Sequence, residues 1–317
     1  MASLAENGMD FRQLRYFLEI VDQGSITRAS KALNVAQPAL SLHMRNMEAG
    51  LGTRLLERSR LGVAPTEAGE LLARRGRMIL DDLARTEEEI RRLDREPGGL
   101  VRIGLPGTIS GIVALPALIA ARERYRGVTV NIAEAMSGFI GDWLREGRVD
   151  LAVLYARAED AVATSELLLE EELVVLWRRE ADLPDQIGLS ELRGTPLVLP
   201  SAAHGLRAQI DEACEVLGFS PEIAIEIDSY ANIKRLVAAG FGASILPLHA
   251  VAEEVRSGVL SISRIAAPGL WRGAYLIQPT GRPATRAQAA VRDLLREVIL
   301  GLLERGEWVG ARAPGRT

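Results

Sequence analysis

The chain has one cysteine, no long apolar run and no recognisable targeting segment among its 317 residues. With Cys214 alone it can form neither an internal disulfide nor a cluster of thiolates around zinc. No apolar stretch approaches the roughly 20 residues of a membrane-spanning helix. Residues 1–10 lack the basic and apolar regions of a signal peptide. These absences exclude membrane proteins and disulfide-rich secreted proteins, and they predict a cytoplasmic protein.

Metal-binding and catalytic patterns are also scarce. The three histidines (His43, His204 and His249) are scattered and do not have the spacing of metal ligands. Ser201, His204 and Asp228 supply the residue types of a catalytic triad, but no Gly-x-Ser-x-Gly elbow surrounds the serine. We therefore expect no metal, no cofactor and no enzyme activity. Cys214 lies among apolar residues of a predicted helix, so we expect a buried, inert thiol.

The net charge of −4 is unevenly distributed along the chain. Residues 1–66 contain 8 Arg or Lys against 6 Asp or Glu, whereas the remainder is acidic overall. The mildly acidic total argues against a nucleic-acid binder, but the local excess of basic residues suits a small DNA-binding module. Because this excess is small, tight binding would require several modules in one oligomer.

Three short helices and a hairpin are predicted within residues 9–66. Apolar residues recur at helical spacing over 11–21 and 25–33, and Ser25 is a good N-cap for the second segment. Asn34 tolerates a left-handed turn, and a third helix begins near Gln37 with Pro38 in its first turn. Beyond it, 51–60 and 63–65 flank Gly62, which predicts a two-stranded wing.

A long helix is predicted from residue 67 to residue 96, with Thr66 as its cap. Apolar residues recur at alternating spacings of four and three, which is typical of a dimerising coiled coil. Gly76 and Thr86 interrupt this stripe. We expect dimer contacts from Leu72, Ile79, Leu83 and Ile90. Pro97-Gly98-Gly99 would end the helix and form a hinge.

Strands and helices alternate beyond residue 99. Such alternation predicts parallel sheets wrapped by helices, and its length suggests two α/β lobes with a cleft between them. The expected strands are 100–105, 128–133, 151–154, 173–177, 197–199, 223–227, 244–246, 259–265 and 274–278. The expected helices are 115–125, 139–146, 206–217, 230–239, 248–257 and 285–303. The final residues, 310–317, are predicted to be disordered, with Trp308 partly exposed.

The second and third helices have the features of a helix–turn–helix. Ala29 and Ser30 are small enough for the helix crossing, and 34–36 can form the tight turn. Gln37 and Ser41 would contact bases, with Pro38 and His43 beside them, and Thr27, Arg45, Arg58 and Arg60 would contact phosphates. A three-helix bundle with a merely solvated polar face is the alternative.

Several motifs resemble LysR-type transcriptional regulators. They are 11–17 (FRQLRYF), 24–30 (GSITRAS), 36–41 (AQPALS), 55–58 (LLER) and 65–69 (PTEAG). The segments 20–25, 62–69, 101–105 and 151–155 further resemble the nitrogen-assimilation-control branch of that family. Many relatives have Arg directly after the recognition-helix serine, whereas this chain has Leu42. We therefore expect His43 and Arg45 to make the DNA contact that this arginine would provide.

This resemblance implies a dimer or tetramer that regulates promoters, as an activator or a repressor. Double-stranded promoter DNA is the expected partner, with RNA polymerase and a small-molecule effector as further candidates. The implied fold is an N-terminal winged helix–turn–helix, a long linker helix and a two-lobed α/β domain like periplasmic binding proteins. The expected divisions are 1–8 (disordered), 9–66 (DNA-binding), 67–97 (dimerisation), 98–305 (regulatory; lobe I about 98–169 and 270–305, lobe II about 170–269) and 306–317 (tail).

The expected effector site lies where strands end and helices begin. Turns with hydroxyl groups and free N–H groups can bind anions there, and an arginine could pair with a carboxylate. The candidate residues are Thr108, Ser110, Ser137, Ser201 and Arg207. The alternative is that they only cap helices, because the nitrogen-assimilation-control branch is thought to act without an inducer. A second alternative for the whole chain is a ligand-sensing protein of the same fold without a transcriptional role.

Overall fold

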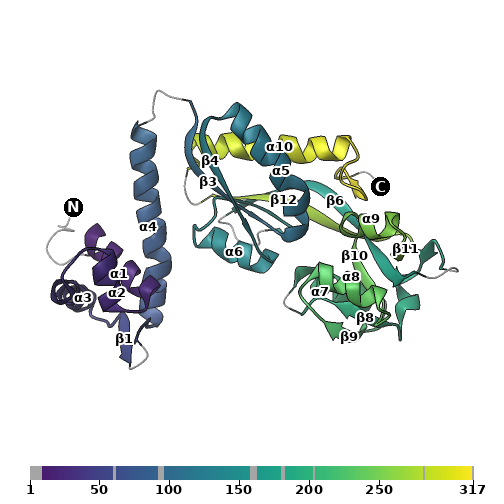
Figure 1. Cartoon of the computed structure of the whole chain (residues 1–317), viewed down its shortest axis with the longest axis horizontal. Coiled ribbons are helices and arrows are strands. Elements are labelled where there is room, and N and C mark those ends of the chain that lie inside the picture. Colours follow the sequence, from purple (N-terminus) through teal and green to yellow (C-terminus); the bar gives the residue numbers. More distant parts are fainter. Residues whose placement is uncertain are drawn as a thin grey trace. The chain divides into compact units, whose positions relative to one another are not determined.

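The computed structural model of the chain describes the residues 9–59, 62–91, 96–157, 163–179, 183–202, 204–280 and 283–315 (Figure 1). Internal contacts divide it into two units, one made of Met1–Asp94 with Glu146–Arg148 and a second made of Arg95–Arg145 and Val149–Thr317. Within the described residues, no helix is long and apolar enough to cross a membrane.

The first unit contains four helices and a two-stranded wing. They are α1 (Phe11–Gln23), α2 (Ile26–Ala32), α3 (Gln37–Leu51), β1 (Leu56–Ser59), β2 (Gly62–Pro65) and α4 (Glu67–Arg91). Side-chain caps start three of the helices. Ser25 accepts from the Arg28 amide, Thr66 accepts from the Gly69 amide at 3.1 Å, and Asp10 forms a capping box with Gln13. The predicted helix–turn–helix and wing are therefore confirmed as elements.

The turn between α2 and α3 has the expected geometry. Asn34 adopts φ 54°, in the left-handed region, and the small residues Ala29 and Ser30 are buried. Phe17, Leu40 and other apolar side chains from α1 and α3 form the core of this unit.

Gly76 in α4 has a packing role rather than a disruptive one. A Cβ atom there would lie 2.5 Å from Cδ1 of Leu14, so the glycine allows α1 to pass close to α4. Arg77 of α4 also pairs with Asp22 of α1. The interpretation of Gly76 as an interruption of the stripe is wrong, because this part of α4 faces its own unit.

The second unit is built on one large sheet and one small sheet. The large sheet has the order β4-β3-β5-β12-β6-β11-β7, with β10 and β13 also paired to β6, and β8 pairs with β9 in the small sheet. The strands are β3 (Gly98–Leu105), β4 (Gly127–Glu134), β5 (Leu151–Leu154), β6 (Ala163–Arg178), β7 (Gln186–Ile187), β8 (Pro196–Leu199), β9 (Glu222–Glu226), β10 (Ser244–Pro247), β11 (Leu260–Ile265), β12 (Leu270–Pro279) and β13 (Ala311–Arg312). The helices are α5 (Gly107–Arg124), α6 (Ser137–Arg145), η1 (Leu189–Leu192), α7 (Gly205–Val216), α8 (Tyr230–Ala238), α9 (Leu248–Arg256) and α10 (Arg286–Glu304).

The expectation of purely parallel sheets is wrong. β3 pairs in parallel with β4 and β5, but β12 pairs antiparallel with both β5 and β6. The reason is that β6 and β12 are far longer than predicted. The chain passes from one hydrophobic core to the other along β6 and returns along the antiparallel β12.

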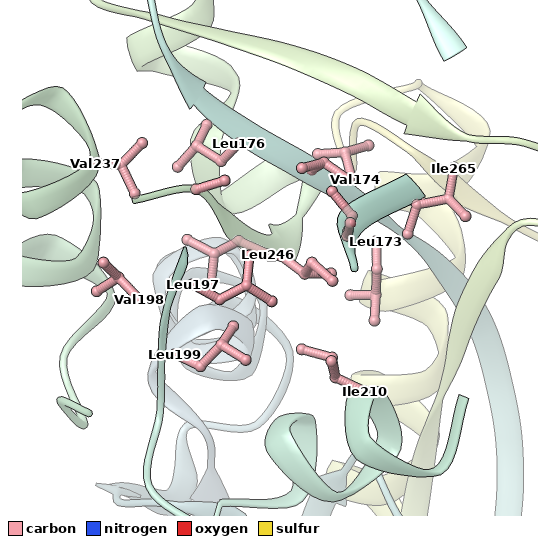
Figure 2. Packing of buried hydrophobic residues seen from close by; sticks show 14 of the residues in the cluster. Leu173, Val174, Leu176, Leu197, Val198, Leu199, Ile210, Val237, Leu246 and Ile265 are labelled. Carbon is pink, nitrogen blue, oxygen red and sulfur yellow. The ribbon is translucent and has the colours of Figure 1, made fainter. Parts of the chain in front are cut away.

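The two larger hydrophobic cores of this unit define its lobes, and a smaller cluster forms beneath α6. The lobe I core includes Ile103, Val113 and Leu295, and the lobe II core includes Val198 and Ile210. In lobe II, side chains from β6, β8, β10, α7 and α8 pack against one another (Figure 2). Cys214 belongs to the lobe II core, where burial raises its thiol pKa to about 11, so the expected buried thiol is confirmed.

The C-terminal residues depart from the predicted disorder. Trp308 is only 1% exposed and packs in the lobe I core, and Ala311–Arg312 form β13 against β6. The predictions of a disordered tail and a partly exposed Trp308 are thus wrong for the described residues. A buried indole anchors the segment, and backbone pairing then orders the residues after it.

Candidate functional site

Helix α3 presents a polar face that its own unit does not cover. Leu40, Met44 and Met47 point into the core, whereas Gln37, Pro38 and Arg45 are exposed. Gln37 and Arg45 are eight residues apart, so they lie about two turns from each other along the helix and about 80° apart round it. Thr27 of α2 is exposed as well.

Two other predicted contact residues are less accessible. The Oγ atom of Ser41 is buried and has no hydrogen-bond partner among the described residues, so a different rotamer would be needed to turn it outward. His43 is half-buried and lies edge-on to Tyr16 of α1, with 5.2 Å between ring centroids. The geometry therefore gives His43 a packing role and leaves Gln37 and Arg45 as the accessible polar groups.

The wing is anchored to the core of the unit by Leu56 and Val63. Arg58 pairs with Val63 across the hairpin, but its side chain and the whole of Arg60 lie outside the described residues. Sequence reasoning missed Asn46, which is exposed beside Arg45. Asn46 is four residues after Leu42 and so lies on the same face of the helix as Leu42. This spacing could have identified Asn46 from the sequence.

Helix α4 carries an exposed apolar stripe. Ile79 is 42% exposed, Leu83 36% and Ile90 64%, whereas Leu72 packs against the core of its own unit. Exposed apolar side chains in line on one helix are typical of an oligomer contact. The structure thus divides the predicted dimerisation set, with Leu72 inward and the other three exposed.

The predicted effector residues lie at helix starts in both lobes. Thr108 is in the first turn of α5, where its hydroxyl lies 2.8 Å from that of Tyr155, and Ser137 begins α6. Ser110 is half-buried in α5. Ser201 follows β8 in lobe II.

Arg207 is already paired within lobe II. Its guanidinium donates to Asp211 and to Glu226, each at 2.8 Å, and also to the carbonyl of Pro200. Burial alone would lower the pKa of Arg207, but these carboxylates raise it. An arginine with two carboxylate partners has little capacity left for a ligand.

The Ser201, His204 and Asp228 set does not form a relay. Ser201 Oγ bonds directly to Asp228 Oδ2 at 3.0 Å, while His204 Nδ1 accepts from the Leu206 amide at 3.1 Å and so caps α7. A triad requires histidine between the serine and the carboxylate.

A buried ion pair that sequence reasoning missed lies where the lobes join. Glu171 of β6 and Arg272 of β12 are cross-strand neighbours, and their side chains are 1% and 2% exposed. Glu171 Oε2 also accepts from the Trp308 indole at 3.2 Å and from the Tyr155 hydroxyl at 3.4 Å, and His249 Nδ1 lies 3.1 Å away. Burial alone would raise the pKa of Glu171, but Arg272 and His249 hold it at about 2.

Arg272 retains unused donors. Its guanidinium carbon is 3.5 Å from the Tyr155 ring centroid, and its two terminal nitrogens find no acceptor of good geometry among the described residues. Tyr230, at the start of α8, is close enough for Arg272 to lower the pKa of its hydroxyl, although burial raises that pKa overall. Burial and then Arg272 also lower the pKa of His204, whose ring centroid is 5.8 Å from that of Tyr230.

Comparison with known proteins gives consistent matches over the chain. Residues 11–70 match the family described as bacterial regulatory helix-turn-helix protein, lysR family, and residues 94–299 match the LysR substrate binding domain. The nitrogen assimilation regulatory protein nac of Escherichia coli (strain K12) is 31% identical over 95% of this chain and 99% of its own length. Its namesake in Klebsiella aerogenes is 33% identical over 94% and 96%.

Solved structures show the same fold. A full-length variant of OxyR from Pseudomonas aeruginosa matches with a TM-score of 0.71 at 23% identity, over 92% of this chain and 94% of that one. CbnR, described as a LysR family transcriptional regulator, matches with a TM-score of 0.66 at 23% identity, over 92% and 99%.

The buried carboxylate predicts a specific acid sensitivity. Since the pKa of Glu171 is lowered from 4.5 to about 2 on folding, its contribution to stability is complete above pH 4.5 and is lost as the pH falls towards 2. The substitution Glu171→Gln would leave Arg272 unpaired, so we expect the free energy of unfolding at pH 7 to fall by about 3–5 kcal/mol. Urea unfolding followed by circular dichroism between pH 7 and pH 3 measures both effects.

Glu166→Gln is the matched control, because Glu166 forms an exposed ion pair with Arg296. We expect it to change little, since exposed pairs are screened by water. Equal destabilisation by both variants, or an unchanged pH slope in Glu171→Gln, would contradict the assignment.

Proposed function

Because the chain belongs to the LysR family of bacterial transcriptional regulators, we propose that it controls promoters of nitrogen-assimilation genes as a symmetric oligomer. Membership in the family confirms the resemblance seen in the sequence motifs, and DNA binding follows from it. The nitrogen role is supported by the two nac proteins, which align over nearly the whole chain. A regulator of this kind works beside the chromosome and RNA polymerase, so a cytoplasmic location is part of the proposal.

The exposed face of α3 is the observation that carries DNA recognition. Gln37 offers the amide pair that can read adenine in the major groove, and Arg45 offers a cation for a phosphate. Both are exposed on a helix that the rest of its unit holds firmly through Leu40 and Met44. In this proposal α3 is the recognition helix, and Thr27, Pro38, Arg58 and Arg60 flank it. The alternative of a ligand sensor without DNA would leave this face without a use.

The first test separates base reading from phosphate binding. After genome-wide mapping of bound DNA has identified the operator, Gln37→Ala should reduce the preference for operator over unrelated DNA by about 10- to 100-fold. Arg45→Ala should instead weaken binding to every sequence and reduce the salt slope by about one. Both are measured by fluorescence anisotropy across a salt series. An unchanged preference in Gln37→Ala would overturn its assigned role.

Symmetric binding requires an oligomer, and the proposed contact is the exposed stripe of α4. The double substitution Leu83→Glu, Ile90→Glu places four charges in the interface of each dimer, so we expect the molar mass in solution to fall to that of a smaller species. Light scattering after size exclusion measures the mass.

Leu71→Glu is the matched control for this experiment. Leu71 is 52% exposed on the same helix, but it lies about 120° round the helix from Leu83 and about 100° from Ile90, the two substituted positions. We expect this variant to keep the mass of the unmodified protein. If the double variant also keeps that mass, α4 does not form the main contact.

A small carboxylate is the effector class that the interlobe residues fit best. Thr108, Ser110 and Ser137 at the starts of α5 and α6, and Ser201 after β8, remain the proposed residues. The anchoring arginine is proposed to be Arg272 instead of Arg207, because Arg272 has two unused donors and Arg207 has two carboxylate partners. Two parallel N–H groups are suited to a carboxylate.

Calorimetry with a panel of small mono- and dicarboxylates tests this assignment. Arg272→Lys keeps the charge but loses the paired donors, so we expect affinity to fall at least about tenfold, and Tyr230→Phe should also weaken binding. Arg207→Ala should leave affinity unchanged. Binding that is lost in Arg207→Ala but kept in the other two variants would contradict the assignment, as would the absence of binding by any carboxylate.

A further inference from the structure

The hinge between the two lobes is short and can be located from the hydrophobic cores. On β6, Leu169 belongs to the lobe I core and Leu173 to the lobe II core, so Glu170–Glu172 lie between them. On β12, Arg272 lies between Leu270 of lobe II and Ala274 of lobe I. Two antiparallel strands therefore connect the lobes here, and a ribbon of only two strands twists easily.

The C-terminal segment Trp308–Arg312, which we call the strap, adds a third strand at this hinge. Ala311 pairs with Glu171 and Arg312 with Glu170, and the Glu172 amide donates to the Gly310 carbonyl at 2.8 Å. On the same β6 strand, pairing with β10 begins at Leu173. The strap thus covers the part of β6 that crosses between the lobes.

Side chains of the strap attach it to both lobes. Trp308 packs in the lobe I core, and its ring centroid is 5.5 Å from that of His249 on α9. Gly310 packs on Leu248 of α9, where a Cβ atom would lie 2.8 Å from the leucine Cβ. The first contact is to lobe I and the other two are to lobe II, so the strap spans the hinge rather than lying on one side of it.

Charge pairing repeats along the three hinge glutamates. Glu170 pairs with Arg312 of the strap at 3.0 Å, Glu171 with Arg272, and Glu172 with Arg264 of β11. Arg312 also stacks on Trp271, with its guanidinium carbon 3.8 Å from the ring centroid. Each glutamate therefore has its own arginine from a different segment, and the pair of Glu170 with Arg312 attaches the strap to the hinge.

From these contacts we infer that the strap is a lock that sets the angle between the lobes and limits their motion. Releasing it would loosen the hinge while leaving both cores intact. This claim concerns the second unit alone and does not depend on which genes the protein controls. Its regulatory consequence rests on the proposed function: release of the strap should change transcription without changing operator affinity.

Gly310→Ala is the variant that releases the strap. Gly310 has φ +76° and presses on Leu248, so a methyl group both strains the backbone and pushes the segment from α9. Gly315→Ala is the matched control, because Gly315 has φ +74° but a Cβ atom there would meet nothing within 4 Å. Arg312→Ala is a second release variant that leaves the backbone and Trp308 unchanged.

Distances between the lobes are measured by pulsed electron resonance. Spin labels are attached to cysteines introduced at the exposed Glu123 on α5 and Glu215 on α7, in oligomers diluted with unlabelled chain. The natural Cys214 is buried, so the introduced thiols are labelled selectively. Hydrogen exchange of the Glu172 amide, which bonds to the strap, is measured on the same variants.

We expect Gly310→Ala and Arg312→Ala to broaden or shift the interlobe distance and to speed exchange at the hinge at least about tenfold. Exchange in β5 and β10, inside the two cores, should stay unchanged, as should all readouts in Gly315→Ala. An unaltered distance distribution in both release variants would overturn the lock. So would an equal effect of Gly315→Ala, or a general rise in exchange through both cores. If the protein proves not to control nitrogen-assimilation genes, the expected interlobe distances are unchanged, so the two proposals fail independently.

Discussion

The buried pairing of Glu171 with Arg272 is the constraint on which the arrangement of the second unit depends. A carboxylate removed from water is stable only if a cation and further hydrogen-bond donors surround it. Here the partners come from distant parts of the chain: Tyr155 and Trp308 belong to lobe I, and His249 belongs to lobe II. Residues of both lobes and of the C-terminal segment thus meet around the Glu171 carboxylate.

This constraint explains why the lobes join where they do. Each core is apolar and self-contained. The residues between the two cores are polar and pair across the crossing strands, and the strap pairs with the same stretch of β6. In the proposed lock, these contacts together set the angle between the lobes. The unused donors of Arg272 lie at this same point.

The first unit follows a simpler physical logic. Its core holds α3 by one face and leaves the opposite face polar, while α4 extends an apolar stripe that its own unit does not cover. The local basic excess is small, so electrostatic attraction to DNA from one unit is weak. In the proposed dimer, joining two units through α4 supplies the affinity that one lacks, and two-fold symmetry then requires two half-sites in the DNA.

Local patterns made much of this predictable from sequence. The helix caps at Ser25 and Thr66, the turn at Asn34 and the buried face of α3 depend on neighbours within a few residues. The lengths of β6 and β12 were underestimated. Residues 170–172 are a run of charge inside an apolar segment, which does not resemble a buried strand. Their partners Arg312, Arg272 and Arg264 are about 90 to 140 residues away in the chain. The burial of Trp308 and the choice between Arg207 and Arg272 likewise depend on tertiary contacts, although Asp211, four residues after Arg207, was a local sign that Arg207 is paired.

In the proposed function, this chain reads promoter DNA through α3 as a two-fold symmetric regulator. Genome-wide mapping of the DNA bound in cells tests this role most directly. We expect enrichment at promoters of nitrogen-assimilation genes, with a motif of two half-sites related by two-fold symmetry and spaced by about one helical turn or a multiple of it. Binding without sequence enrichment, or a motif without two-fold symmetry, would contradict it.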